Sequence, residues 1–164
     1  MKNGVKLVAM VAALVLMVGC DTEKEGGAPA SKFKLTDLQH SWKLITGSTK
    51  VATLVIPDIF DKNNPLISGN PEAMAAMCNK GNILQLKSDM TFGEKSDCYQ
   101  GKTEEGTYTF NEKEGTFEVK YKNLQTPSRL YVIKSLNASQ LVVEYSGTNS
   151  TGIPFTSTIT YNKN

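Results

Sequence analysis

Apolar and polar residues alternate one by one along much of the chain, which is the pattern of β-strands with one buried face. The clearest case is the stretch 116–122, where Phe117, Val119 and Tyr121 point to one face and charged residues occupy the positions between them. Turn-forming residues separate similar stretches at regular spacing. The alternation predicts nine short strands, at 42–46, 51–56, 83–87, 91–95, 106–110, 116–122, 129–136, 140–147 and 153–161.

Short polar turns join these predicted strands into hairpins. The loop 111–115 supplies Gly115 where a positive φ is needed, and the turn 137–139 brings one strand back onto the next. Many short strands connected in this way are typical of an antiparallel barrel or sandwich. We therefore expect an all-β domain.

The same alternation assigns a set of large apolar side chains to the interior. In a small barrel such side chains either fill the interior or line a cavity that holds one ligand, and the sequence leaves both roles open. The candidate ligand-lining residues are Trp42, Tyr108, Phe110, Phe117, Val119 and Tyr121.

One long segment, 57–81, breaks the rhythm of strands. Asn70 is suited to cap a helix and Pro71 to occupy its first position, while Gly81 can end it, so we predict one short helix over 71–77. Long connections in compact domains are often functional rims.

The N-terminus has the order of a secretion signal. Lys2 and Lys6 precede the apolar run Leu7–Val18, whose twelve residues are fewer than the about 20 that a membrane-spanning helix needs. The run ends in Gly-Cys, which resembles the lipobox of bacterial lipoproteins. This resemblance implies that residues 1–19 are a lipoprotein signal peptide and that Cys20 carries the lipid; the alternative is an ordinary signal peptide with an incidental cysteine.

Residues 20–33 lack large apolar side chains apart from Phe33 and are rich in charge, Gly and Pro, so they cannot bury enough surface to fold. We expect them to be a flexible tether between the lipid and a single domain at 34–164. The expected location is the cell envelope of a Gram-negative bacterium, at the outer membrane, with the lipid as the membrane contact.

The remaining cysteines form a pair once Cys20 is lipidated. Export permits a disulfide between Cys78 and Cys98, which would close a loop of about 20 residues and contribute on the order of 3 kcal/mol. Two free thiols or a metal pair are the alternatives, although the spacing does not suit a CxxC site. We predict the disulfide.

Charge argues against a nucleic-acid partner. The chain has 18 basic and 16 acidic residues, and removal of the signal with Lys2 and Lys6 leaves 16 of each. A neutral domain lacks the basic footprint of a nucleic-acid-binding protein.

Catalytic chemistry is also sparse. His40 is the one histidine, and no Gly-x-Ser-x-Gly motif accompanies it. The acidic run after Asp58 fails the EF-hand pattern. We therefore expect no enzyme, no metal and no cofactor. The acidic residues that we assign to turns or to solvent-facing positions are Asp89, Asp97, Glu104, Glu105, Glu112, Glu114, Glu118 and Glu144.

Several short motifs occur in the order seen in the lipocalin-like domains of bacterial lipoproteins, which the chain resembles over about 35–161. Cys78 and Cys98 flank one of the matching hairpins, as paired cysteines often do in those domains. The motifs are Trp-Lys-Leu at 42–44, Leu-Gln-Leu at 84–86, Asp-Met-Thr-Phe at 89–92 and Gly-Thr-Tyr at 106–108.

The resemblance implies an up-and-down barrel of about eight strands, open at one end, with an apolar cavity inside. Two functions follow. One is a non-enzymatic binding module that holds a small apolar ligand at a membrane. The other is a protein-interaction module, an envelope inhibitor or an accessory subunit, that uses its strand edges or the loop 57–81.

Overall fold

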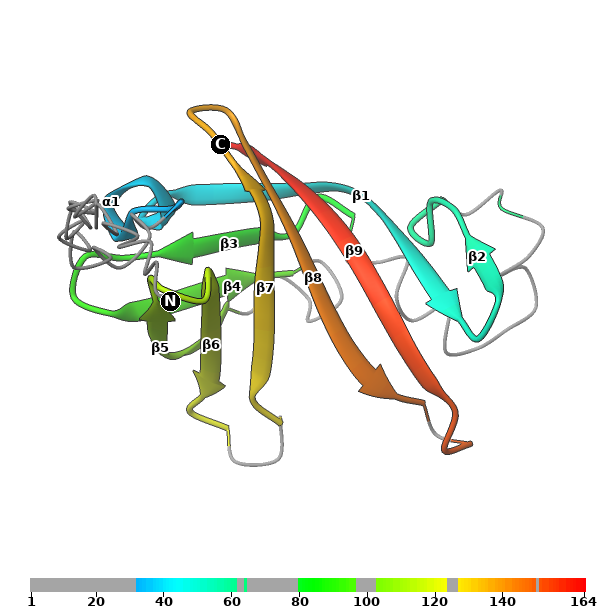
Figure 1. The fold of residues 1–164 in the computed structure, drawn as a ribbon. Helices are drawn as coiled ribbons and strands as arrows, with labels where there is room; N and C mark the ends of the chain where they lie inside the picture. Colours follow the sequence, from blue (N-terminus) through cyan, green and yellow to red (C-terminus); the bar gives the residue numbers. More distant parts are fainter. Residues whose placement is uncertain (1–31, 62–63, 65–79, 97–102, 124–126, 150) are drawn as a thin grey trace, which may run out of the picture.

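A computed structural model describes residues 32–61, 64, 80–96, 103–123, 127–149 and 151–164. This part of the chain forms one short helix and nine strands (Figure 1). The elements are α1 (Leu35–Leu38), β1 (Ser41–Val51), β2 (Leu54–Ile56), β3 (Ile83–Leu86), β4 (Thr91–Lys95), β5 (Thr103–Asn111), β6 (Thr116–Tyr121), β7 (Arg129–Leu136), β8 (Gln140–Thr148) and β9 (Pro154–Lys163).

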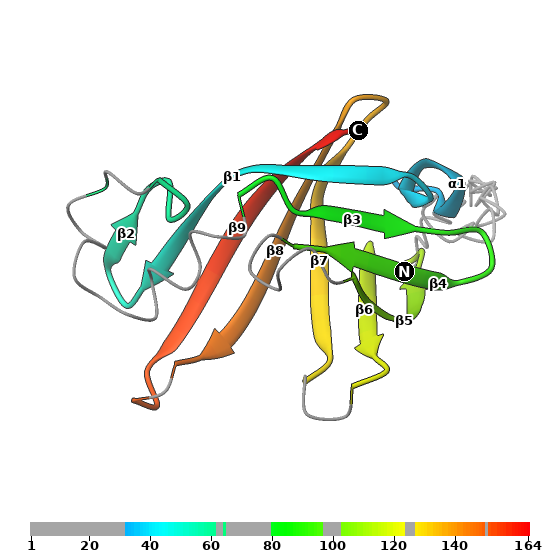
Figure 2. The same ribbon diagram turned by 180° about the vertical axis from the view of Figure 1, so that it is seen from behind.

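The strands form an up-and-down antiparallel barrel. Their order is β2-β1-β3-β4-β5-β6-β7-β8-β9, and β1 also pairs with β9. Strands β1 and β3 to β9 therefore close an eight-stranded barrel, and β2 is an extra strand on the far end of β1 (Figure 2). The all-β barrel expected from the sequence is confirmed.

Strand β1 differs most from its expected boundaries. The sequence predicts a break after residue 46, but β1 continues to Val51 and pairs with β9 from Trp42 to Val51. A register shift between Leu44 and Thr46 accommodates Ile45 as an extra residue on the outside. Gly47 follows, and a Cβ there would lie 2.7 Å from the Phe60 ring, so the glycine makes room for a side chain that packs into the barrel wall.

The helix α1, which was not predicted from the sequence, covers one end of the barrel beside the start of β1 (Figure 1). Leu38 at its end and Trp42 on β1 are both fully buried, and the Trp42 indole donates a hydrogen bond of 2.9 Å to the Leu38 carbonyl oxygen. The His40 ring meets that indole edge to face, with centroids 5.8 Å apart. The short hairpin turns of the barrel lie at this closed end.

Among the described residues, aromatic and aliphatic side chains contribute equally to the buried core of the barrel, nine of each. Tyr108, Phe117 and Val119 are each no more than 2% exposed, and Tyr121 is 7% exposed. Phe110 is half-buried and packs at the margin of this core. β9 begins one residue after the start of the strand predicted at 153–161, and Ile153 is 45% exposed in the preceding turn.

The open end of the barrel is the opposite one, where β4, β6 and β8 end and β5, β7 and β9 begin. The predicted helix at 71–77, the signal peptide and the residues Cys20, Cys78 and Cys98 lie outside the described residues, so they stay predictions. Within the described residues, no helix is long and apolar enough to cross a membrane.

Candidate ligand-binding site

A cavity of about 80 Å³ lies inside the barrel, and its wall is half polar and half apolar. The polar half consists of one carboxylate, one guanidinium and three phenols. Aliphatic side chains and one phenyl ring form the remainder. The lining residues are Leu44, Ile59, Phe60, Glu94, Arg129, Tyr131, Tyr145, Ile159 and Tyr161.

Strand alternation explains why two charged side chains reach the interior. Side chains two residues apart on a strand share a face. Glu94 follows the buried Phe92 by two residues on β4, and Arg129 precedes the buried Tyr131 by two residues on β7. Both charges therefore occupy inward positions, although β4 and β7 are separated by two other strands in the sheet.

The carboxylate of Glu94 is held by two hydrogen-bond donors. The Tyr121 hydroxyl donates to its Oε2 at 2.9 Å, and the Asn82 amide nitrogen lies 3.5 Å from its Oε1. The Arg129 guanidinium lies 5.6 Å from the centre of the Tyr121 ring and faces the Tyr131 hydroxyl. In the part of the chain that the structure describes, no ion pair within 4.0 Å joins Glu94 to Arg129.

Burial favours the neutral form of three tyrosines in or beside the cavity, Tyr121, Tyr131 and Tyr161. It raises the pKa of Tyr131 to about 12, and it also raises the pKa of Tyr121 and of Tyr161. Burial by itself would lower the pKa of Arg129, but the neighbouring Tyr131, Tyr121 and Glu94 raise that pKa above its ordinary value. The cavity therefore offers a permanent cation beside phenols that can donate hydrogen bonds.

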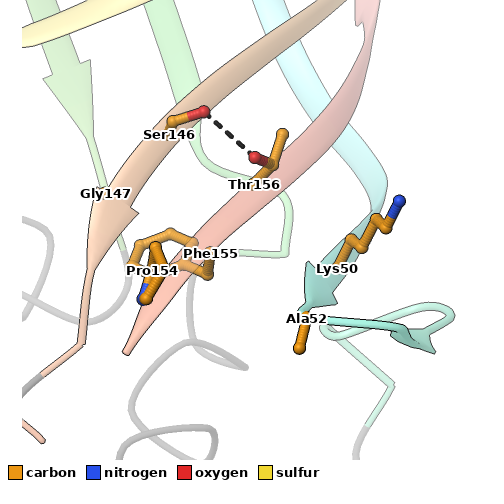
Figure 3. A pocket seen from close by; sticks show the side chains of 7 residues that line it. All are labelled: Lys50, Ala52, Ser146, Gly147, Pro154, Phe155 and Thr156. Carbon is orange, nitrogen blue, oxygen red and sulfur yellow. Dashed lines mark hydrogen bonds between the residues drawn. The ribbon is translucent and has the colours of Figure 1, made fainter. Parts of the chain in front are cut away.

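A larger groove of about 370 Å³ lies at the rim, where β1 and β8 end and β9 begins (Figure 3). The Phe155 ring lies over Gly147, where a Cβ would be 2.9 Å from the ring. Phe155 also meets Tyr145 of the inner cavity edge to face, with ring centroids 5.8 Å apart. The groove is lined by Lys50, Ala52, Ser146, Gly147, Pro154, Phe155 and Thr156.

Comparison with known protein families agrees with the barrel topology. A family model described as a lipocalin-like domain matches residues 38–143. The chain belongs to the lipocalin-like domain family. This covers the barrel from the end of α1 into β8, and it confirms the resemblance drawn from the short sequence motifs.

Solved structures with the lipocalin-like fold are similar only at a distance. A DUF4847 family protein from Bacteroides vulgatus is 14% identical, with 77% of this chain and 93% of that chain covered and a TM-score of 0.45. A bovine odorant binding protein in complex with its natural ligand is 17% identical, with 81% and 75% covered and a TM-score of 0.44. A deswapped triple mutant of bovine odorant binding protein is 14% identical, with 78% and 74% covered and a TM-score of 0.43. The chain matches no curated protein.

The six candidate ligand-lining residues of the sequence analysis lie in the lipocalin-like barrel, but none is among the residues that line the described cavity. Trp42 and Tyr108 pack at the closed end, where the Tyr108 hydroxyl donates to the Lys87 carbonyl oxygen at 2.7 Å. Phe117 and Val119 fill the core, and Phe110 packs beside them. Tyr121 reaches the site through its hydroxyl on Glu94. A ligand-lining role for these six stays a prediction.

The two charged members of the cavity wall, Glu94 and Arg129, were not predicted from the sequence. Glu94 is an acidic residue that belongs neither to a turn nor to the outer surface, and Arg129 is a basic residue with the same property. The available signal was the alternation itself, which places Glu94 with Phe92 and Arg129 with Tyr131 on one face.

Proposed function

We propose that this lipocalin-like protein is a non-enzymatic, lipid-anchored envelope protein that binds a small, mainly apolar molecule through the open end of its barrel. The observation that carries the proposal is the convergence of Glu94, Arg129 and three phenols on a cavity inside an otherwise mainly apolar core. Partly burying charged groups costs free energy, which a barrel built only for stability avoids by using apolar side chains.

The sizes of the two hollows suggest how a ligand would lie. One water needs about 10–15 Å³ of such space, so the cavity of about 80 Å³ accommodates several waters or one small chemical group. Ligand pockets of proteins commonly measure about 300–1,000 Å³. We infer that the cavity receives the polar end of the molecule and that the groove beyond Phe155 receives part of its apolar body.

Ligand binding can be tested with an environment-sensitive apolar dye and two matched variants. The parent protein should bind the dye, and Ile59→Phe should weaken binding at least tenfold, about 1.4 kcal/mol, because Ile59 lines the cavity and a ring would occupy it. Ile45→Phe makes the same change on the outer face and should leave the affinity unchanged. Equal binding by both variants, or no binding by the parent, would count against the proposal.

Anchoring is tested separately, because it rests on the N-terminal sequence. Cells that make the protein should incorporate labelled fatty acid into it, and Cys20→Ser should abolish both the labelling and the sedimentation of the protein with membranes. Cys78→Ser is the matched control and should keep both. Undiminished labelling of the Cys20→Ser protein would show that the lipid is attached elsewhere or that the signal is of the ordinary kind.

A second function, protein interaction, is favoured by the apolar surface of the extra strand. Leu54 and Val55 of β2 are each 54% exposed, and β2 pairs with β1 along one edge. Exposed strand edges are sites where another chain can add a strand. We hold this as the alternative: the protein would use β2, or the adjoining loop 57–81, as an envelope inhibitor or an accessory subunit.

A further inference from the structure

Glu94 and Arg129 bring opposite charges to one cavity from different strands. The Glu94 carboxylate accepts a hydrogen bond from Tyr121, and the Arg129 guanidinium lies over the ring of the same tyrosine. Because no ion pair within 4.0 Å joins them among the described contacts, each charge keeps a side that faces the cavity. The pair sums to zero charge, and the neighbouring tyrosines are neutral.

This arrangement discriminates among ligands by their charge. A ligand with a single charge would pair with one of the two residues and leave the other without an oppositely charged partner from the ligand. The occupied site would then carry a net charge. Net charge is costly away from water. An uncharged ligand would form no ionic contact with either residue. A head that carries both charges satisfies both residues and keeps the site neutral.

The geometry of the wall also matches the two halves of such a head. A guanidinium presents a planar fork of N–H donors that suits the two oxygens of a carboxylate. An ammonium group is attracted both to a carboxylate and to aromatic rings, and Tyr131, Tyr145 and Tyr161 line the same cavity as Glu94. The volume of about 80 Å³ restricts the head to a compact one, with its charges a few bonds apart.

We propose that the barrel selects an amphipathic molecule with a compact zwitterionic head, whose carboxylate pairs with Arg129 and whose ammonium group pairs with Glu94. The apolar body of the ligand then contacts Leu44, Ile59 and Phe60 on the opposite wall. This inference rests on the proposed ligand-binding function and specifies its chemical class. The class is defined by the two opposite charges of the head, and several molecules share it.

The proposal is tested with four probes that share one alkyl chain and differ in the head. These are 2-aminodecanoic acid, decanoic acid, decylamine and decan-1-ol, each titrated against the full mature chain at neutral pH by displacement of the apolar dye. The zwitterionic probe should bind at least tenfold more tightly than each of the other three.

Two charge-neutralising variants assign each half of the head. Glu94→Gln should lower the affinity for 2-aminodecanoic acid about tenfold and make decanoic acid the better of the two singly charged probes. Arg129→Gln should give the same loss and favour decylamine. Glu105→Gln is the matched control, since Glu105 pairs with Lys122 at 2.8 Å on the outer surface, and it should leave the ranking of the probes unchanged.

The outcomes separate this inference from the function on which it rests. If all four probes bind and their affinities rank only by how apolar the head is, the two charges do not select a zwitterionic head. The zwitterion proposal then fails, while the proposed ligand-binding function stands. If no probe binds and the dye does not bind either, the proposed function fails as well. The ranking on the parent protein decides the matter even if a variant does not fold, which circular dichroism would reveal.

Discussion

Phe117→Ala should lower the free energy of unfolding by about 3–5 kcal/mol, the usual cost of removing a buried ring from a packed core. Phe117 is 1% exposed and stacks on Tyr131, with ring centroids 4.9 Å apart and an interplanar angle of 22°. It does not line the described cavity, so truncation opens a new void instead of enlarging an existing one. Urea titration of the mature domain measures the change, and the melting temperature should fall by about 10 °C or more.

The matched control for this variant is Leu130→Ala. Leu130 lies on β7 and points outward with 57% of its surface exposed, so its truncation should change the free energy of unfolding by about 0.5 kcal/mol or less. A loss below about 1.5 kcal/mol for Phe117→Ala, together with weaker dye binding, would mean that Phe117 lines a ligand cavity, as the sequence allowed. Our interpretation of the core would then be wrong.

The strands could be predicted because each strand of this barrel buries the side chains of one face and exposes those of the other. Each of the nine predicted strands overlaps one that the structure contains, and the inward positions of β6 coincide with the predicted ones at Phe117, Val119 and Tyr121. The alternation of apolar and polar residues does not predict a strand that is held in the barrel by other contacts. In the second half of β1 the polar residues pair with β9, and Gly47 lies against the Phe60 ring. The sequence of that half therefore lacks the alternation of apolar and polar residues by which a strand is predicted. The helix α1 has four residues, too few for a helical period to be visible.

The candidate site could not be predicted for a different reason. A charged residue within an alternating strand is ordinarily assigned to the solvent-facing side. The spacing from Phe92 and Tyr131 opposes that assignment for Glu94 and Arg129, but it does not show that the two residues share a cavity. The two residues come together only because the sheet closes through the β1–β9 pairing, which turns the inner faces of β4 and β7 toward each other. Closure depends on contacts between the two ends of the domain, and such long-range pairing leaves no local pattern.

Gly106→Ala should be about as damaging as loss of the core ring, although it adds a single methyl group. Gly106 pairs with Phe92 of β4 on one side and with Tyr121 of β6 on the other. A Cβ at this position would overlap the backbone carbonyl oxygen of Lys120 and would lie 2.6 Å from the Phe92 ring. The backbone oxygen belongs to the neighbouring strand and cannot move without breaking the ladder. We expect a loss of about 3 kcal/mol or more in urea titration.

The damage should also reach the ligand site, because Phe92 and Tyr121 pack edge to face beside Gly106 with ring centroids 5.1 Å apart. Moving the Tyr121 ring displaces the hydroxyl that donates to Glu94, so Gly106→Ala should weaken probe binding where the protein still folds. Gly93→Ala is the matched control, since its Cβ would meet only the Thr103 methyl carbon at 3.3 Å. That side chain can move aside, and the alanine reduces the freedom of the unfolded chain, so stability should be unchanged or rise by about 0.5 kcal/mol. Equal effects of the two substitutions would show that Gly106 is not held between the two strands as the structure has it.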